Sequence, residues 1–83
     1  MPKTLRSPRQ RRLIELLVLR RKEAGLSQAA LAEALGRYQS VIAAMELGSR
    51  RIDVIELLDI ADFVGFDIHE LIDALRAVPR QSA

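Results

Sequence analysis

The sequence predicts an all-α domain of five short helices, and three observations support this prediction. Only three of the 83 residues are aromatic, so the core must be built mainly from Leu, Ile, Val and Ala, a composition that favours packed helices. Apolar residues recur at helical spacing in five segments, and the four glycines of the chain separate those segments, as expected of residues that follow helix ends. A chain of this length has room for one domain with one modest core.

The helix boundaries are predicted from capping residues. Ser7 before Pro8, then Ser27, Asp53 and Asp67, each precede an apolar-periodic segment, and short polar side chains at that position accept a hydrogen bond from the first helical turn. The first helix is expected from residue 8 to just before the glycine at 25. The others are expected over residues 28–35, 38–47, 54–64 and 68–78. Apolar spacing predicts inner faces that include Val41, Ile42 and Met45 in the third helix and Ile55, Leu58, Ile60 and Ala61 in the fourth.

These elements divide the chain into a basic flexible arm (residues 1–7), a folded domain (8–78) and a disordered tail (79–83). Charge is unevenly distributed along it. Residues 1–51 carry eleven Lys or Arg against four acids, a net of +7, whereas residues 52–83 carry two against seven, a net of −5. One end of the fold is therefore expected to approach a polyanion while the other repels it.

Several function classes lack their usual residues. There is no cysteine and a single histidine, His69, with no cluster of His, Cys or carboxylates at ligand spacing, so no metal site, cofactor or enzymatic activity is expected. No apolar run is long enough to cross a membrane, and the segment after Met1 has no apolar stretch of signal-peptide type.

The segment from Gly25 to Gly48 is the most informative for function. Only Gly36, Arg37 and Tyr38 connect its two short helices, a connection that favours a steep crossing of the helix-turn-helix kind. The N–H groups at the start of the first of these helices suit a phosphate oxygen, and Gln28 adds a side-chain donor there. Gln39 and Ser40 open the second helix, and Gln matches the N6 and N7 edge of adenine.

Across residues 13–75 the sequence resembles the Cro and phage-repressor-like (XRE) family of helix-turn-helix regulators. The pattern begins with Arg21-x-x-x-Gly25-Leu26-Ser27-Gln28-x-x-Leu31-Ala32-x-x-Leu35-Gly36 and continues with Ile42-x-x-x-Glu46-x-Gly48. Asp53-x-x-x-Leu57-x-x-Ile60-Ala61 and then Val64-Gly65 complete it. The resemblance implies a five-helix, lambda-repressor-like DNA-binding domain that binds double-stranded DNA as a transcriptional regulator, of repressor type, with its recognition helix in the major groove.

The resemblance also implies roles for individual residues. Gln28 would bind phosphate, and the recognition helix would present Gln39, Ser40, Ala43 and Ala44 to the groove. Arg21 and Glu46 match an ion pair that orients the recognition helix in relatives. Further DNA contacts are expected from Arg37, Tyr38, Arg50 and Arg51, which flank that helix, and from Lys3, Arg6 and Arg9 near the N-terminus.

Two departures from the family pattern affect the expected specificity. Relatives carry polar or cationic residues where this chain has Ala43 and Ala44, and a smaller residue or proline where it has Tyr38. Alanine can touch a thymine methyl group but forms no hydrogen bond. Base recognition is therefore expected to depend on Gln39, Ser40 and Arg37, with DNA shape contributing the rest.

A homodimer on a pseudo-palindromic operator is the expected assembly, because one recognition helix contacts few base pairs. It would pair through the last two helices, whose apolar residues exceed what one small core needs. These residues are Phe63, Phe66, Ile68, Ile72 and Leu75. The alternative is a protein-interaction module, such as an antitoxin or accessory subunit, in which the two alanines reflect protein binding. A protein of either kind would be cytoplasmic. The regulator would be of bacterial or phage origin and associated with the nucleoid.

Overall fold

A computed structural model describes residues 7–80, which fold into five helices with no strand. The helices are α1 (Pro8–Glu23), α2 (Gln28–Leu35), α3 (Gln39–Leu47), α4 (Val54–Val64) and α5 (Ile68–Arg76). The predicted all-α, five-helix class is confirmed. Residues 1–6 of the predicted arm, with Lys3 and Arg6, and residues 81–83 of the predicted tail lie outside the described residues.

The predicted N-caps are present at four of the helices. The side chains of Ser7, Ser27, Asp53 and Asp67 accept hydrogen bonds from backbone N–H groups in the first turns of α1, α2, α4 and α5. At α3 the prediction was one residue too long, because Tyr38 is the N-cap and makes no side-chain capping bond. That helix therefore begins with fewer of its N–H groups satisfied than the other four.

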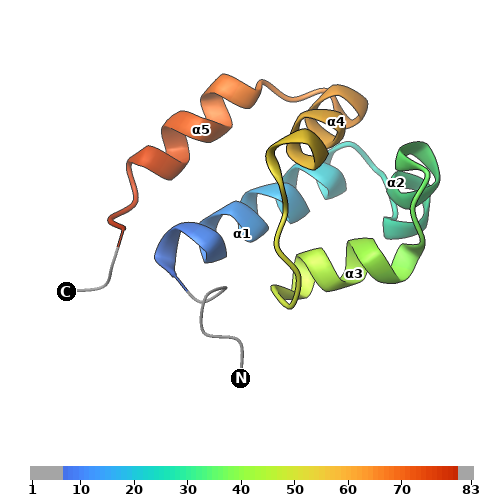
Figure 1. The fold of residues 1–83 in the computed structure, drawn as a ribbon. Coiled ribbons are helices and arrows are strands. Elements are labelled where there is room, and N and C mark those ends of the chain that lie inside the picture. Colours follow the sequence, from blue (N-terminus) through green and yellow to red (C-terminus); the bar gives the residue numbers. More distant parts are fainter. Residues whose placement is uncertain (1–6, 81–83) are drawn as a thin grey trace.

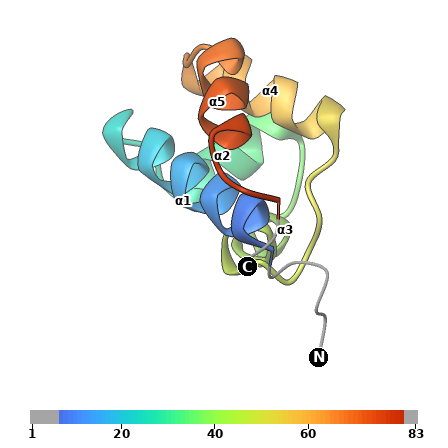
Figure 2. The ribbon, with the colours of Figure 1, turned by 90° about the vertical axis from the view of Figure 1, so that its left-hand side faces the viewer.

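Helix α1 is the central element of the fold. Figures 1 and 2 both show it between α3 on one side and α5 on the other, while α2 packs against both α3 and α4. Helix α3 thus lies at one edge of the molecule (Figure 1), away from the acidic C-terminal helices. This arrangement separates the charge of the two halves of the chain in space.

The core lies where the five helices meet. Ile42 on α3 is the most deeply buried large side chain, and it packs in one cluster with Leu16, Leu17, Leu31, Ala32, Met45, Leu57, Ile60 and Leu71. The predicted inner face of α4 was partly wrong. Ile55 and Leu58 are exposed, and the buried face follows Leu57, Ile60 and Ala61, whose i, i+3, i+4 spacing fits one helical stripe.

Gly48 ends α3 in a conformation that few residues other than glycine adopt. Its φ is +82°, and a Cβ atom there would lie 3.2 Å from Cδ1 of Ile14 on α1. Both the left-handed backbone and the close approach therefore favour glycine. This residue allows the end of α3 to pack against α1.

Arg9 connects the two ends of the described chain. Its Nε donates to the carbonyl of Val78 at 2.8 Å, and its Nη2 donates to the carbonyl of Arg76 at 3.4 Å. A cation at these carbonyls offsets the partial negative charge at the end of α5. The guanidinium of Arg9 therefore contacts the C-terminal end of α5 and the residues after it, and its predicted contact with DNA stays a prediction.

Candidate nucleic-acid interface

Helices α2 and α3 form the predicted helix-turn-helix, with a turn of three residues between them. Gly36 at the end of α2 has φ +67°, and the N–H of Arg37 then donates to the carbonyl of Ala32 at 2.9 Å. This closure of the helix end turns the chain sharply. The first turns of α2 and α3 are consequently brought close enough for their side chains to touch.

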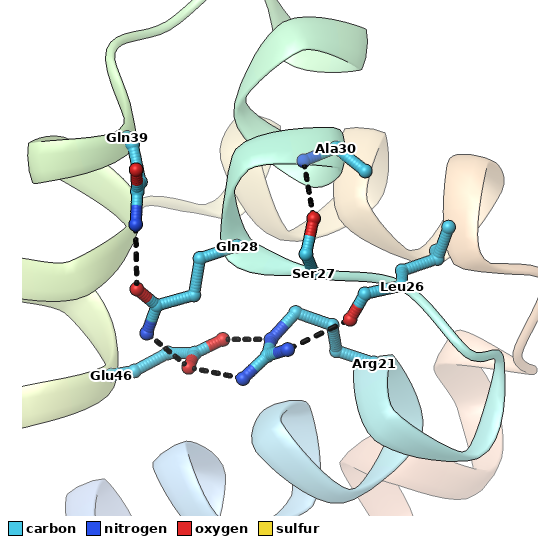
Figure 3. Close-up of polar contacts among 7 residues, drawn as sticks. All are labelled: Arg21, Leu26, Ser27, Gln28, Ala30, Gln39 and Glu46. Atoms are coloured by element: carbon cyan, nitrogen blue, oxygen red, sulfur yellow. Dashed lines mark hydrogen bonds and ion pairs between the residues drawn. The ribbon is translucent and has the colours of Figure 1, made fainter.

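An ion pair joins α1 to α3 behind this unit (Figure 3). Nε and Nη2 of Arg21 donate to the two carboxylate oxygens of Glu46 at 2.7 and 2.9 Å. The remaining terminal nitrogen, Nη1, donates to the carbonyl of Leu26 at 2.8 Å. Both side chains are about nine-tenths buried. Arg21 therefore links three segments. Its two-pronged contact with Glu46 joins α1 to α3, and its bond to Leu26 joins α1 to the turn before α2.

Gln28 and Gln39 extend this network toward the surface. Nε2 of Gln28 donates to Glu46 at 2.9 Å, and Nε2 of Gln39 donates to Oε1 of Gln28 at 3.5 Å, a long and weak contact. Because an ionised carboxylate only accepts hydrogen bonds, Glu46 determines which way the Gln28 amide faces. That orientation turns the Gln28 oxygen toward Gln39 and leaves the Gln39 oxygen without a partner among residues 7–80.

The ion pair is charged on both sides. Burial alone would raise the pKa of Glu46, but hydrogen bonds from Arg21 and Gln28 outweigh it, so the pKa is lowered overall. The hydrogen bond to Glu46 raises the pKa of Arg21. Glu46 is therefore a carboxylate that accepts hydrogen bonds from three nitrogen atoms of two side chains.

The outer face of α3 is unusually apolar. Gln39 and Ser40 are exposed, Ala43 and Ala44 are half-buried, and Tyr38 and Leu47 at the two ends each expose 83% of their surface. Leu47 was not among the side chains predicted to face the groove. It is in phase with Ser40 and Ala43 on a helical surface, and this spacing could have identified it.

Arg37 and Arg50, two of the residues predicted to contact DNA, both bind Glu56, which was not among the predicted site residues. Nη1 and Nη2 of Arg50 donate to the two oxygens of Glu56 at 3.1 and 2.9 Å, and Nη2 of Arg37 lies 2.7 Å from one of them. Arg51 is exposed. Glu56 is the third residue of α4 and closes a capping box with Asp53. That sequence signal, Asp53 followed three residues later by Glu, was available, but the arginine partners come from other segments.

The Glu56 carboxylate is also ionised. The hydrogen bond from Arg50 lowers its pKa against the opposing effect of burial, and the same contact raises the pKa of Arg50. His69, by contrast, is exposed on α5. Within residues 7–80 no group of three or more His, Cys, Asp or Glu could hold a metal ion, and no helix there is long and apolar enough to cross a membrane.

Three features define a helix-turn-helix domain. Helices α2 and α3 cross steeply, a polar network connects their first turns, and α3 lies at the edge of the molecule. Comparison with known proteins agrees with this class. A family model described as helix-turn-helix matches residues 17–71. A solved structure, an XRE-family like protein from Pseudomonas syringae pv. tomato str. DC3000, is 40% identical with a TM-score of 0.78. The similarity covers 83% of this chain and 84% of that one.

The chain belongs to the XRE family of helix-turn-helix proteins, which are DNA-binding regulators. The resemblance seen in the sequence is thereby confirmed. No curated protein matches the sequence.

Proposed function

We propose that the protein binds double-stranded DNA sequence-specifically and represses transcription by inserting α3 into the major groove. The observation that carries this proposal is the ordered network from Arg21 through Glu46 and Gln28 to Gln39. It places an oriented glutamine at the first turn of the helix that lies at the edge of the molecule. A base-contacting side chain that is already oriented loses less entropy on binding.

The network suits adenine at one position of each half-site. With one Nε2 hydrogen directed to Gln28, Gln39 retains an oxygen and a second hydrogen, which match the N6 donor and N7 acceptor of adenine. Gln28 retains its second Nε2 hydrogen for a phosphate oxygen near the start of α2. Ser40 can hydrogen-bond a base edge, whereas Ala43, Ala44 and Leu47 suit thymine methyl groups more than polar base edges.

A homodimer that pairs through α4 and α5 completes the proposal. Ile72 and Phe63 are 40% and 45% exposed. An open groove of about 370 Å³ runs between α1 and α5, with Leu13, Ile72 and Leu75 in its lining. A second copy seated there would cover apolar surface and allow two α3 helices to contact a pseudo-palindromic operator.

Selection of bound duplexes from a random pool tests the proposal. The expected result is an enriched, two-fold-related sequence with adenine at one position of each half-site. Selection with Gln39→Ala should relax the preference at that position, with a loss of about 1–3 kcal/mol for the cognate base. If no sequence is enriched, the apolar outer face of α3 favours the alternative, a protein-interaction module.

A further inference from the structure

The cluster of Glu56, Arg37 and Arg50 lies on the α4 side of α3, and the network around Gln39 does not include it. Arg37 comes from the turn before α3, and Arg50 from the segment after it. Both guanidinium groups nevertheless approach the same oxygen, Oε2 of Glu56, at 2.7 and 2.9 Å. The two segments that flank α3 are therefore tied to one point in the first turn of α4.

The cationic and acidic side chains of this cluster are unequally exposed. Among the three side chains one carboxylate faces two guanidinium groups, a net charge of +1, and the Asp53 carboxylate, whose charge also acts on Arg50, offsets it from the start of α4. The acid is covered and the cations are not. The Glu56 side chain is 8% exposed, whereas those of Arg37 and Arg50 are 39% and 35% exposed. The two guanidinium groups are thus presented at the surface beside α3, with the Glu56 carboxylate beneath them.

The acceptor is saturated while the donors are not. The Glu56 carboxylate accepts hydrogen bonds from both terminal nitrogens of Arg50 and from the backbone N–H of Asp53, and it forms an ion pair with one terminal nitrogen of Arg37. Arg37 approaches Glu56 through one terminal nitrogen, and Nε of Arg50 has no partner among residues 7–80. Guanidinium groups have five N–H donors, so both arginines retain donors for an anion while Glu56 holds them.

We infer that Glu56 is a positioning residue that holds Arg37 and Arg50 as a two-arginine clamp for one stretch of the DNA phosphate backbone. It acts through the arginines and does not itself touch DNA. Two long side chains that are already fixed lose less freedom when they bind phosphate, and contacts to phosphate position a protein without selecting sequence. This inference rests on the proposed DNA binding, and it assigns the role to an acid, the residue type that DNA would otherwise repel.

Duplex affinity of the Glu56→Gln variant separates this role from simple charge effects. Loss of a negative charge beside DNA should tighten binding if only net charge matters. The clamp predicts the opposite, a weakening of about tenfold at constant salt as the arginines lose their fixed positions. The selected duplex and a scrambled duplex should weaken by the same factor, because backbone contacts are independent of sequence. Asp59→Asn is the matched control, since Asp59 is exposed on the same helix and loses the same charge. It should bind as tightly as the unmodified protein, or slightly more tightly.

Three other outcomes would contradict the clamp. If Glu56→Gln binds as tightly as the unmodified protein or more tightly, the clamp is wrong. If only the selected duplex is weakened, Glu56 orients α3 instead, and the clamp is again wrong. If the unmodified protein binds neither duplex, the proposed function fails and the clamp fails with it.

Should Glu56→Gln fail to fold, as judged by circular dichroism, Arg37→Ala replaces it, because that variant leaves the Arg50–Glu56 pair intact. The slope of log affinity against log salt concentration should then become shallower by about one for each subunit bound. An unchanged slope would overturn the clamp.

Discussion

At the scale of single residues, two buried carboxylates organise the surface around α3. Glu46 orients Gln28 and, through it, Gln39, while Glu56 receives Arg37 and Arg50. Such pairs contribute little net stability compared with apolar residues of similar size, but loss of one partner leaves a buried charge. Arg21→Ala, which leaves Glu46 with only the hydrogen bond from Gln28, should therefore destabilise the domain by roughly 3–5 kcal/mol.

Gln28→Ala should weaken binding to every duplex, and to the selected duplex somewhat more, because Gln28 also orients Gln39. The substitution removes the proposed phosphate contact, which is independent of base sequence, while Glu46 keeps both hydrogen bonds from Arg21. Fluorescence anisotropy with the selected and a scrambled duplex measures the two affinities. A loss restricted to the selected duplex would show that Gln28 acts through Gln39 and not on the backbone.

The lowered pKa values of Glu46 and Glu56 predict a loss of stability in acid. Each has a folded-state pKa below the ordinary value of 4.5. At a pH between the folded-state pKa and 4.5, the unfolded chain therefore binds more protons than the folded protein. The stabilisation is therefore complete above about pH 4.5 and is lost as the pH falls through the folded-state pKa. Urea unfolding at pH 7, 5, 4 and 3.5 measures this dependence. Glu46→Gln should depend less steeply on pH below 4.5, and an unaltered dependence would contradict the assignment.

At the scale of helices, local sequence signals predicted most boundaries because those boundaries depend on neighbouring residues. Ser27 and Asp53 cap helices that begin at the next residue, and Gly36 and Gly48 follow the last residue of α2 and α3. Errors arose where neighbouring apolar residues allow more than one phase, as with Ile55 and Leu58 on α4.

Contacts between distant segments were less accessible from the sequence. The Arg21–Glu46 partnership followed only from resemblance to a family. The pairing of Glu56 with two arginines and the capping of α5 by Arg9 depend on how the helices pack, which periodicity and capping do not specify.

Substitution of two glycines separates backbone strain from crowding. Gly36 and Gly48 both have positive φ, but a Cβ at Gly36 meets nothing within 4 Å, whereas one at Gly48 lies 3.2 Å from Ile14. Gly36→Ala should cost about 1–2 kcal/mol from strain alone. Gly48→Ala should cost more, since Ile14 must also shift. Thermal unfolding of both variants measures the difference, and equal losses would show that Ile14 yields without cost.

At the scale of the whole molecule, the fold separates the edge formed by α3 from an acidic opposite side. Helices α3 and α5 lie on opposite sides of α1 (Figure 2), and residues 52–83 carry the net negative charge. The potential of the molecule is therefore polarised in a way that suits approach to DNA by one edge.

Ile72→Glu should give a folded monomer with reduced affinity for the selected duplex. Ile72 is 40% exposed, so a charge there should leave the core intact and oppose pairing through α5. Leu75 is a poorer site for this test, because it packs against the core. Sedimentation at micromolar concentration measures the assembly. A monomeric unmodified protein that binds the duplex with full affinity would remove the dimer from the proposal.

The salt dependence of duplex binding tests the central claim most directly. If each subunit of a dimer neutralises about four phosphates, the slope of log affinity against log salt concentration should be about −7. The selected duplex should bind more tightly than a scrambled one throughout the titration, because base contacts add to the electrostatic part. A slope near zero, or equal affinity for the two duplexes at every salt concentration, would contradict sequence-specific DNA binding by this domain.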